Sequence, residues 1–450
     1  DPTSSALRNE AVRLGEDDPG LWRHLAGDPQ RVIEVALDSM ELGAWDDALG
    51  LLGRRYPTGD GVFAEAGAPA PQEHPEVAYY RGFCREKLGG SGRADFDAAS
   101  TMDTTYVFPH RAASLPVLRR ALESNPKDAT AHFLLGSLHL SGGLAHAAVT
   151  EWDEARRLRP DLKVLHRNLG LTLLHATRDL PRALDVLREG ARVDPENVQV
   201  HEALDQVLGL LGRPAEERLA ALEAYPRLEA LPAPLVFKRV LALVEVGRFE
   251  DAERALAGRF FPREEFGTNV RQVFVEARIQ KALARARAQD CGAARNLVAA
   301  IGSEAAGLPF TRDGLSAFAD TARIQYLAGE VQASCGDVPA ARRHWERAAA
   351  AADAYPQPNL AFALAAARRL GGGRPDAVRL RVEQALAAWA NRLRVGTNFP
   401  GPNACGQGLM LLALGRDGEA REKLEEALRL PDRILSHYLS RAALRGEGGS

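Results

Sequence analysis

The chain has 450 residues, of which 46% are hydrophobic and 26% are charged, and its formal net charge is −3. These proportions are typical of a folded globular protein, and the charge lacks the basic excess that nucleic-acid binding requires. No apolar run reaches the roughly 20 residues of a membrane-spanning helix, so neither nucleic acid nor a membrane is an expected partner.

Cysteine usage indicates a reducing, cytoplasmic setting. The four cysteines lie far apart, form no C-x-x-C pair and are accompanied by no asparagine sequon: Cys84, Cys291, Cys335 and Cys405. No signal peptide precedes Asp1. The sequence does not begin with methionine, and one interpretation is that it is a fragment of a longer protein.

The N-terminal part predicts a helical lead-in over residues 1–28, followed by a first helical hairpin over 32–52. Residues 56–74 are rich in glycine, alanine and proline and read as a loop insertion. A helix over 75–88 begins the next hairpin, and its partner loses register around 100–112.

Two consecutive hairpins of nearly equal length follow, because 34 residues separate Pro126 from Pro160 and 35 separate Pro160 from Pro195. Matching positions carry small or large residues in both: Gly136, Ala148, Trp152 and Ala155 in the first, and Gly170, Ala183, Leu187 and Gly190 in the second, after one inserted residue near Thr177. This is the pattern of tetratricopeptide repeats. We expect Gly136 to face Ala148, with Trp152 filling the gap toward the next hairpin.

Neither hairpin can bury its apolar stripe alone, so neighbours must stack into a continuous core. Beyond Pro195 the pattern weakens and then recovers at Gly329, Trp345, Gly408 and Leu424, with further irregular loops near 258–268, 302–314 and 392–402. The sequence therefore predicts an all-α, right-handed α-solenoid of about ten hairpins over 29–431. Residues 432–450 are expected to form a capping helix and tail.

Motifs for catalysis or cofactor binding are missing: the sequence has no G-x-S-x-G, P-loop, H-E-x-x-H or dinucleotide fingerprint. No two of the eleven histidines have the i, i+4 spacing of a helical metal pair, and His132 and His139 fall at packing positions of the repeat. We therefore expect no catalytic residue, no metal and no cofactor, and the chain alone leans away from being an enzyme.

The first helix of each hairpin should line a concave groove, and a set of side chains is predicted to point into it or lie on its edge. These groove candidates are Phe133, Arg167, Asn168, Glu202, Asp205 and Gln206. Asp205 is the least expected, because it replaces the small residue that close helix packing favours.

A carboxylate at that position needs a donor, since an unpaired buried charge costs several kcal/mol. One interpretation is a structural ion pair of Arg167 with Glu202 or Asp205. The other is a polar cluster that holds a ligand through bidentate hydrogen bonds.

An aromatic, proline-containing loop over residues 106–111 interrupts the regular array. It either plugs a gap between repeats or folds into the groove. In the second case Phe108, His110 and Arg111 would join the groove candidates.

These features resemble one bacterial family: the 106–111 loop, then His166-Arg167-Asn168-Leu169-Gly170, then Ala203-Leu204-Asp205-Gln206 with the run from Leu211 to Arg218. Its members carry an N-terminal β-sandwich, often compared with galactose-mutarotase-like domains, before a tetratricopeptide region. The resemblance implies that this chain is the repeat half and that Arg167, Asn168, Asp205 and the Phe108 loop have special roles. Residues 261–267 depart from the His-Pro-Trp-Glu-Gly-Gly-like turn of such relatives.

The sequence thus favours a protein-interaction and assembly module. Its expected partners are a peptide segment, a neighbouring domain such as the β-sandwich, or a second copy of the chain. The alternative is a carbohydrate-binding or carbohydrate-active protein, in which Asp205, Glu202 and His110 would serve as acid and base groups.

Overall fold

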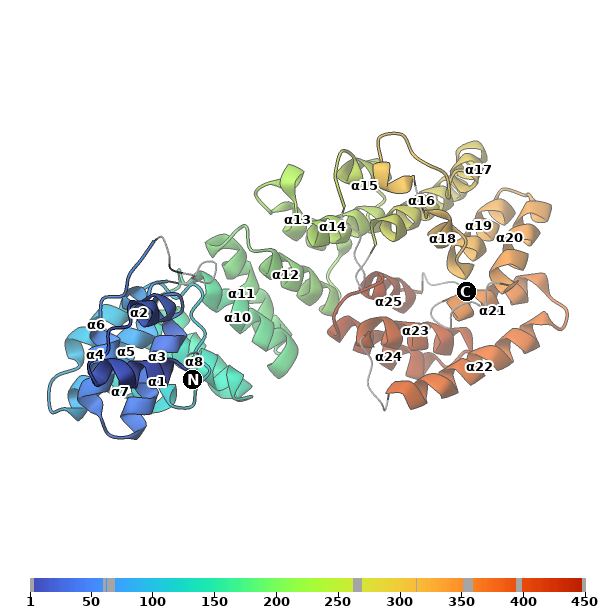
Figure 1. Ribbon diagram of the computed structural model, residues 1–450. Coiled ribbons are helices and arrows are strands. Elements are labelled where there is room, and N and C mark those ends of the chain that lie inside the picture. The colour runs from blue at the N-terminus through green and yellow to red at the C-terminus, as the bar shows by residue number, and fades with distance from the viewer. Residues whose placement is uncertain are drawn as a thin grey trace. The chain divides into compact units, whose positions relative to one another are not determined.

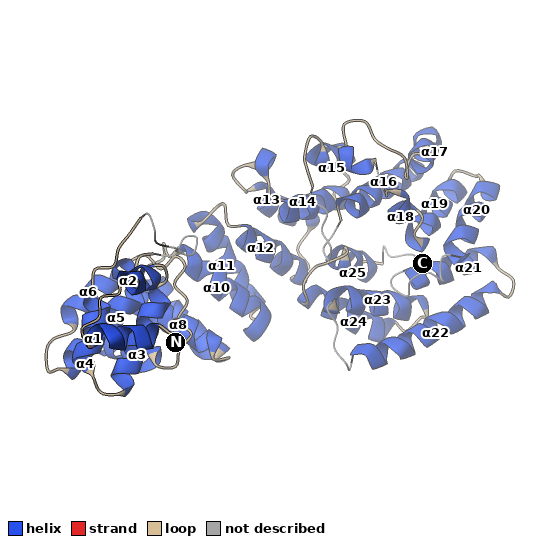
Figure 2. Ribbon diagram, viewed as in Figure 1, coloured by secondary structure: helices blue, strands red, loops and turns tan. Residues whose placement is uncertain are grey.

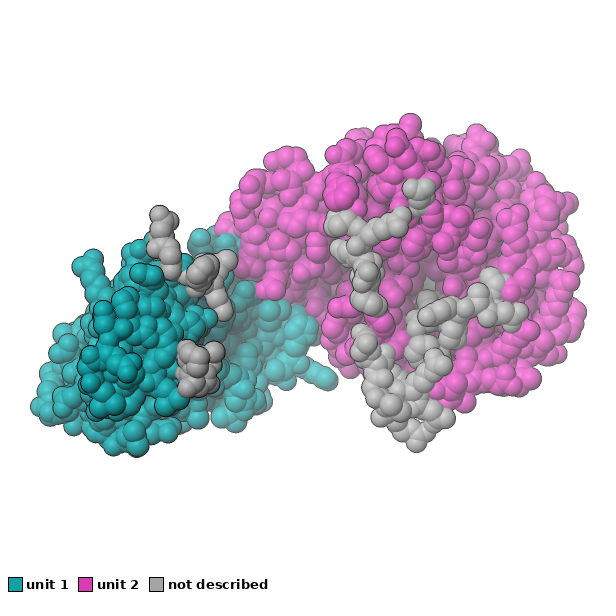
Figure 3. Space-filling model, in the orientation of Figure 1, with its two compact units in different colours: residues 1–194 teal, residues 195–450 magenta. Residues whose placement is uncertain are grey.

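The computed structural model describes residues 4–59, 62, 69–261, 269–312, 314–350, 359–393 and 399–446. Within these ranges every regular element is a helix and no strand occurs (Figure 2). The predicted all-α solenoid of paired helices is confirmed. Two compact units make up the chain, Asp1–Asp194 and Pro195–Ser450, and each is described by itself (Figure 3).

Unit 1 contains helices that pair in sequence order as antiparallel neighbours. They are α1 (Ser5–Arg13), α2 (Pro19–Ala26), α3 (Pro29–Glu41), α4 (Trp45–Gly53), the 3-10 turn η1 (Pro71–Glu73), α5 (Pro75–Lys87), α6 (Arg93–Ser100), α7 (Ser114–Ser124), α8 (Ala129–Ser141), α9 (Ala145–Leu158), α10 (Lys163–Thr172), the π-helical turn η2 (Leu173–Thr177) and α11 (Leu180–Val193).

Glycines on the first helix of a pair make the close crossings. A Cβ on Gly136 would lie 2.6 Å from the indole of Trp152, and one on Gly170 would lie 2.5 Å from Leu187. Trp152 is fully buried and donates from Nε1 to the carbonyl oxygen of Phe133 at 3.0 Å. The expectation that Trp152 fills the gap toward the next hairpin is therefore corrected, because the ring covers the glycine of its own hairpin.

The inserted residue near Thr177 has a structural consequence. The end of α10 changes from α-helix to the π-helical turn η2, and Arg178 then adopts a left-handed conformation with φ of 59°. A π-turn accommodates one extra residue in a helix. The second hairpin thus keeps the packing of Gly170 against Leu187 despite its extra residue.

Unit 2 continues with paired helices and ends with a helix that lies among them. Its elements are α12 (Val198–Leu210), α13 (Ala215–Glu223), η3 (Leu228–Ala230), α14 (Ala233–Glu245), α15 (Phe249–Leu256), α16 (Val270–Arg287), α17 (Cys291–Ala299), η4 (Pro309–Thr311), α18 (Ser316–Ala319), α19 (Ala322–Ser334), α20 (Val338–Ala350), α21 (Asn359–Leu370), α22 (Arg374–Leu393), α23 (Pro400–Ala413), α24 (Asp417–Arg429) and α25 (Ser436–Leu444).

The helices of unit 2 curve round until the first meets the last pair. Helix α12 contacts α24, and Gln206 Nε2 donates to the carbonyl oxygen of Leu428 at 3.2 Å. In Figure 1, α25 lies inside this arc, between α14 and α16 on one side and α23 and α24 on the other. Seven of its nine residues are buried. The segment predicted as a cap at the end of the array is thus enclosed by the helices that precede it.

Cys291, at the start of α17, forms a disulfide with Cys335, which follows α19. The sequence spacing of 44 residues did not indicate this pair, and it departs from the expected reducing setting. Cys84 and Cys405 are buried free thiols.

The predicted irregular segments fall partly outside the described residues. Residues 262–267 of the unusual 261–267 turn lie there, as do parts of the 56–74 and 392–402 loops. The 100–112 segment is described and separates α6 from α7. Among the described helices, none is both long and apolar enough to cross a membrane.

Candidate functional site

A network of buried charges lies on the inner face of unit 2, by which we mean the side of its helices that faces α25. The network begins at Asp205 of α12. Arg218, from α13, donates from Nε to Asp205 Oδ1 at 2.9 Å, where α12 and α13 cross. The same guanidinium reaches Glu245 on α14 through Nη1, at 3.1 and 3.2 Å. The side chains of Asp205, Arg218 and Glu245 are 2%, 1% and 3% exposed. An ion pair thus replaces the contact between glycine and a large side chain found in other hairpins.

The C-terminal segment 430–445 supplies the remaining members of this network. Lys238 Nζ, on α14, lies 3.6 Å from Asp205 Oδ2 and 3.4 Å from Asp432 Oδ2. Asp432 also accepts from the backbone N–H of His437 at 2.9 Å and from the Ser436 hydroxyl at 3.2 Å. Asp432 therefore stabilises the start of α25 through hydrogen bonds and connects it to α14 through the ion pair with Lys238.

Two arginines at the other end of the segment meet Glu245. Arg441 Nη2 lies 3.2 Å from Glu245 Oε1, and Arg445 Nη1 lies 3.4 Å from Glu245 Oε2. Between the two charged contacts, burial and the nearby Glu276 of α16 raise the pKa of the Tyr438 hydroxyl, and Glu276 is itself ion-paired with Arg323 of α19. The segment is therefore held by charged side chains of α14 and faces Glu276 of α16.

Burial opposes ionisation of the acids in the network, but the surrounding cations outweigh it. Arg218, Lys238 and Arg441 hold the pKa of Asp205 below its ordinary value, and Arg441, Arg218 and Arg445 do the same for Glu245. Asp432 also has a lowered pKa, although it too is buried, because His437 and Lys238 face it. Lys238 has a raised pKa despite its burial, since Asp432 and Asp205 favour its charged form. Asp205, Glu245, Asp432 and Lys238 are therefore charged at neutral pH.

Three of the predicted groove residues belong to this inner face. Asp205 is the centre of the network, Gln206 reaches the end of α24, and Glu202 is half-buried with a pKa raised by burial. The predicted ion pair of Arg167 with Asp205 or Glu202 is replaced by local contacts. Arg167 donates to its neighbour Asn168 Oδ1 at 3.1 and 3.2 Å, whereas Asp205 accepts from Arg218.

Phe133 has a different position from the one expected of a groove residue. Its side chain is 1% exposed and packs in the core of unit 1. Arg167 and Asn168 are half-buried on α10. Of these three residues, only Arg167 and Asn168 are accessible to solvent.

The 106–111 loop is anchored to α3. Arg111 pairs with Gln30 and Glu34 of that helix, and Val107 is buried. Phe108 is 55% exposed and His110 is exposed, with its Nδ1 3.2 Å from the carbonyl oxygen of Phe108. The loop is thus fixed at its ends and presents Phe108 and His110 to solvent.

A buried carboxylate lies behind this loop. Glu76 of α5 accepts from Gln30 Nε2 at 2.9 Å and from the Ser114 hydroxyl at 3.1 Å. Burial raises the pKa of Glu76 more than these donors lower it. Its neighbours satisfy both of its oxygens, which is the pattern of a structural contact.

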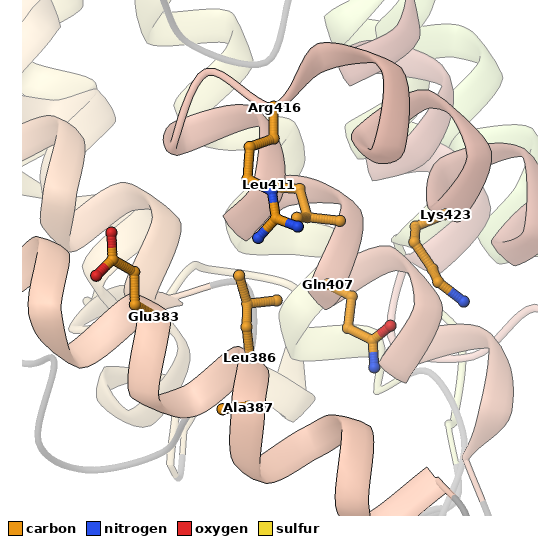
Figure 4. A pocket seen from close by; sticks show the side chains of 7 residues that line it. All are labelled: Glu383, Leu386, Ala387, Gln407, Leu411, Arg416 and Lys423. Carbon is orange, nitrogen blue, oxygen red and sulfur yellow. The ribbon is translucent and has the colours of Figure 1, made fainter.

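A surface cleft of about 480 Å³ opens between α22, α23 and α24 in unit 2 (Figure 4). Seven residues line it: Glu383, Leu386, Ala387, Gln407, Leu411, Arg416 and Lys423. Arg416 is paired with Glu419 at 2.8 Å and Lys423 with Glu426 at 2.6 Å. Both cations are thus neutralised by acids of their own helix, and we assign the cleft no ligand.

Histidines and acids do not gather into a metal site anywhere in the part of the chain that the structure describes. His132, a predicted packing residue, has Nδ1 2.6 Å from Glu151 and Nε2 3.2 Å from the carbonyl oxygen of Pro126. Both ring nitrogens therefore have protein partners.

Sequence reasoning missed six members of the inner-face network: Arg218, Lys238, Glu245, Asp432, Arg441 and Arg445. A signal was present for two of them. Lys238, Arg239 and Glu245 interrupt the apolar run from Leu235 to Val246, and Lys238 and Glu245 are seven positions apart and so lie on one face of a helix. Charges on the apolar face of a helix indicate that buried partners are present.

Comparisons with known proteins found similar structures but no family. The chain matches no protein family and no curated protein. Among solved structures, YrrB, titled a TPR protein with an unusual peptide-binding site, is 19% identical over 56% of this chain and 97% of its own, with a TM-score of 0.28. A tetratricopeptide repeat protein from Parabacteroides merdae is 12% identical over 64% and 96%, with a TM-score of 0.28. Naa15/Naa10 bound to HypK-THB is 14% identical over 93% and 66%, with a TM-score of 0.32.

Proposed function

We propose that this chain is a protein-interaction module and that the inner face of unit 2 binds a helical protein segment. The observation that carries the proposal is the position of α25. A helix with charged and polar side chains is enclosed by the array and contacted by α14, α16, α23 and α24. An amphipathic helix lying in a groove between helices is a recurring mode of protein recognition.

The alternative function, on carbohydrate, has no observation in its favour. Of its acid and base candidates Asp205, Glu202 and His110, the first has a side chain that is 2% exposed and is held as an anion by Arg218 and Lys238. A glycosidase acid must reach the glycosidic oxygen and be protonated at working pH. We therefore do not propose a carbohydrate function.

A second candidate surface for protein binding lies on unit 1. Arg167 and Asn168 are half-buried on α10, and Phe108 and His110 are exposed beside Arg111. We assign these residues to contacts with a protein partner. The resemblance to β-sandwich-containing proteins makes such a domain one partner to test, and a second copy of the chain is another.

The direct test uses the chain's own C-terminal segment as a probe. A labelled peptide of residues 430–446 is titrated into the full-length Arg441→Ala chain, and binding is followed by fluorescence anisotropy. This substitution removes one of the contacts that hold α25 to Glu245 while Arg218 and Arg445 continue to pair with that acid. We expect saturable binding, tighter than to the wild-type chain.

The matched control is Arg416→Ala, which removes an exposed arginine whose partner is Glu419 at the exposed start of α24. This variant should bind the peptide no better than the wild type does. Absence of binding to Arg441→Ala, with its helical content unchanged by circular dichroism, would contradict the proposal.

A further inference from the structure

Helix α25 is enclosed in a way that a terminal cap is not. A capping helix buries one face and presents a polar outer face. In α25 the buried residues include Ser436, His437, Ser440 and Arg441 together with Tyr438 and Leu439. These residues cannot share one face of a helix, so α25 is covered on several sides, in the way that a receptor covers a bound helix.

The charged contacts along α25 have an order. Lys238 on α14 faces Asp432 at the start of the segment, and Glu245 at the end of α14 faces Arg441. Lys238 and Glu245 are two helical turns apart, about 10 Å along the axis. Because Lys238 precedes Glu245 and Asp432 precedes Arg441, the segment and α14 run in the same direction. A helix in the opposite direction would bring cation to cation and anion to anion, which disfavours it.

The connection to α25 is strained. Ile434 and Leu435 have φ of 54° and 59°, so two successive residues with bulky side chains adopt the left-handed conformation. This conformation is unfavourable for both residues, and most of all for a β-branched side chain such as that of Ile434. The strain opposes docking of the segment in its own chain. A helix from another protein would not carry it.

We infer that the inner face of unit 2 selects its partner by charge order, an inference that rests on the proposed function. The partner is an amphipathic helix with an acidic residue just before its first turn, an aromatic residue near Glu276 and an arginine in its second turn, as Asp432, Tyr438 and Arg441 are placed around α25. Helix α25 fills this site in the chain itself, and a partner helix with the same order of charges displaces it.

The experiment compares two peptides of identical composition. One has the native sequence of residues 430–446, and the other exchanges its two charges through Asp432→Arg and Arg441→Asp. Both are titrated into the full-length Arg441→Ala chain and into the wild-type chain, and hydrogen exchange of residues 436–444 is followed in parallel. We expect the native order to bind at least about tenfold more tightly than the exchanged order. Binding should also speed exchange in the chain's own α25.

The outcomes separate the two proposals. If both peptides bind equally well, the charge-order inference is wrong while the helix-binding function stands. Absence of binding by either peptide to either chain would overturn the proposed function itself. If light scattering shows that Arg441→Ala forms dimers without peptide, the occupant is the segment of a second copy, and the inference of a different partner protein is overturned.

Discussion

In unit 1 the paired helices meet through apolar contacts, such as Gly136 against Trp152, whereas in unit 2 the pair α12 and α13 meets through Asp205 and Arg218. An apolar crossing stabilises its hairpin mainly by close packing. A buried ion pair contributes little net stability, because desolvation of both charges offsets their attraction. The charges of unit 2 continue into Lys238, Glu245 and the C-terminal segment, so their effect is to position a helix.

The comparison shows that the same hairpin architecture is built with two kinds of contact between its helices, an apolar one and a charged one. Hairpins with a glycine opposite a large side chain build a stable array. The hairpin with an acid opposite an arginine joins a set of charges that contacts the chain's own C-terminal helix α25. This difference can be tested by substitutions that affect one unit and leave the other unchanged.

The largest effect is expected from Arg218→Ala. It leaves the carboxylates of Asp205 and Glu245 without their shared buried partner, and breaking a buried pair in this way costs about 3–5 kcal/mol. Hydrogen exchange measured by mass spectrometry should show faster opening throughout unit 2 and unchanged exchange in unit 1. The control is Arg213→Ala, since Arg213 pairs with Glu217 at the surface and should change stability by less than about 1 kcal/mol. Equal effects of the two variants would mean that the inner-face charges do not support unit 2.

Loss of the disulfide should be the next effect in size. Cys291→Ser opens a loop closed over 44 residues, and the free energy of unfolding of unit 2 should fall by about 2–4 kcal/mol. Thermal denaturation with and without reductant measures this change. Reductant should lower the midpoint of the wild type and leave that of the variant unchanged.

Cys84 and Cys405 should not react in the folded protein, because burial raises the pKa of each thiol to about 12.

A smaller effect in unit 1 comes from a single methyl group. A Cβ on Gly136 would lie 2.6 Å from Trp152, so Gly136→Ala should destabilise unit 1 by about 1–3 kcal/mol through overpacking. The matched control is Gly50→Ala in α4, where no atom lies within 4 Å of the added methyl group. That variant should be stabilised by up to about 1 kcal/mol, because alanine favours a helix over glycine. Chemical denaturation of both variants gives the comparison.

The smallest effect is a pH dependence of unit 1. Burial lowers the pKa of His74 to about 4, while an unfolded histidine titrates near 6.5. The unfolded state therefore binds more protons between these values, and stability is lost as the pH falls through this window. His74 should account for about 1 kcal/mol between pH 7 and pH 5.5. The midpoint of His74→Gln should fall less over this range than that of the wild type, and parallel curves would rule out the assignment.

The sequence by itself determined the helical hairpins. The same spacing of 16 residues separates the small and the large residue in Gly136 and Trp152 and in Gly329 and Trp345, and a crossing of two helices depends only on residues within one hairpin. The sequence also identified Asp205 as unusual, since a charge stands where packing favours a small residue.

Only the tertiary structure decided what Asp205 and the groove around it contact. The contact between Glu245 and Arg441 joins residues 196 positions apart, and it exists because the helices of unit 2 curve until α12 meets α24. Curvature of a solenoid is the sum of small rotations between successive hairpins, which no local pattern specifies. For the same reason, the disulfide of Cys291 with Cys335 and the enclosure of α25 could not be read from the residues that form them.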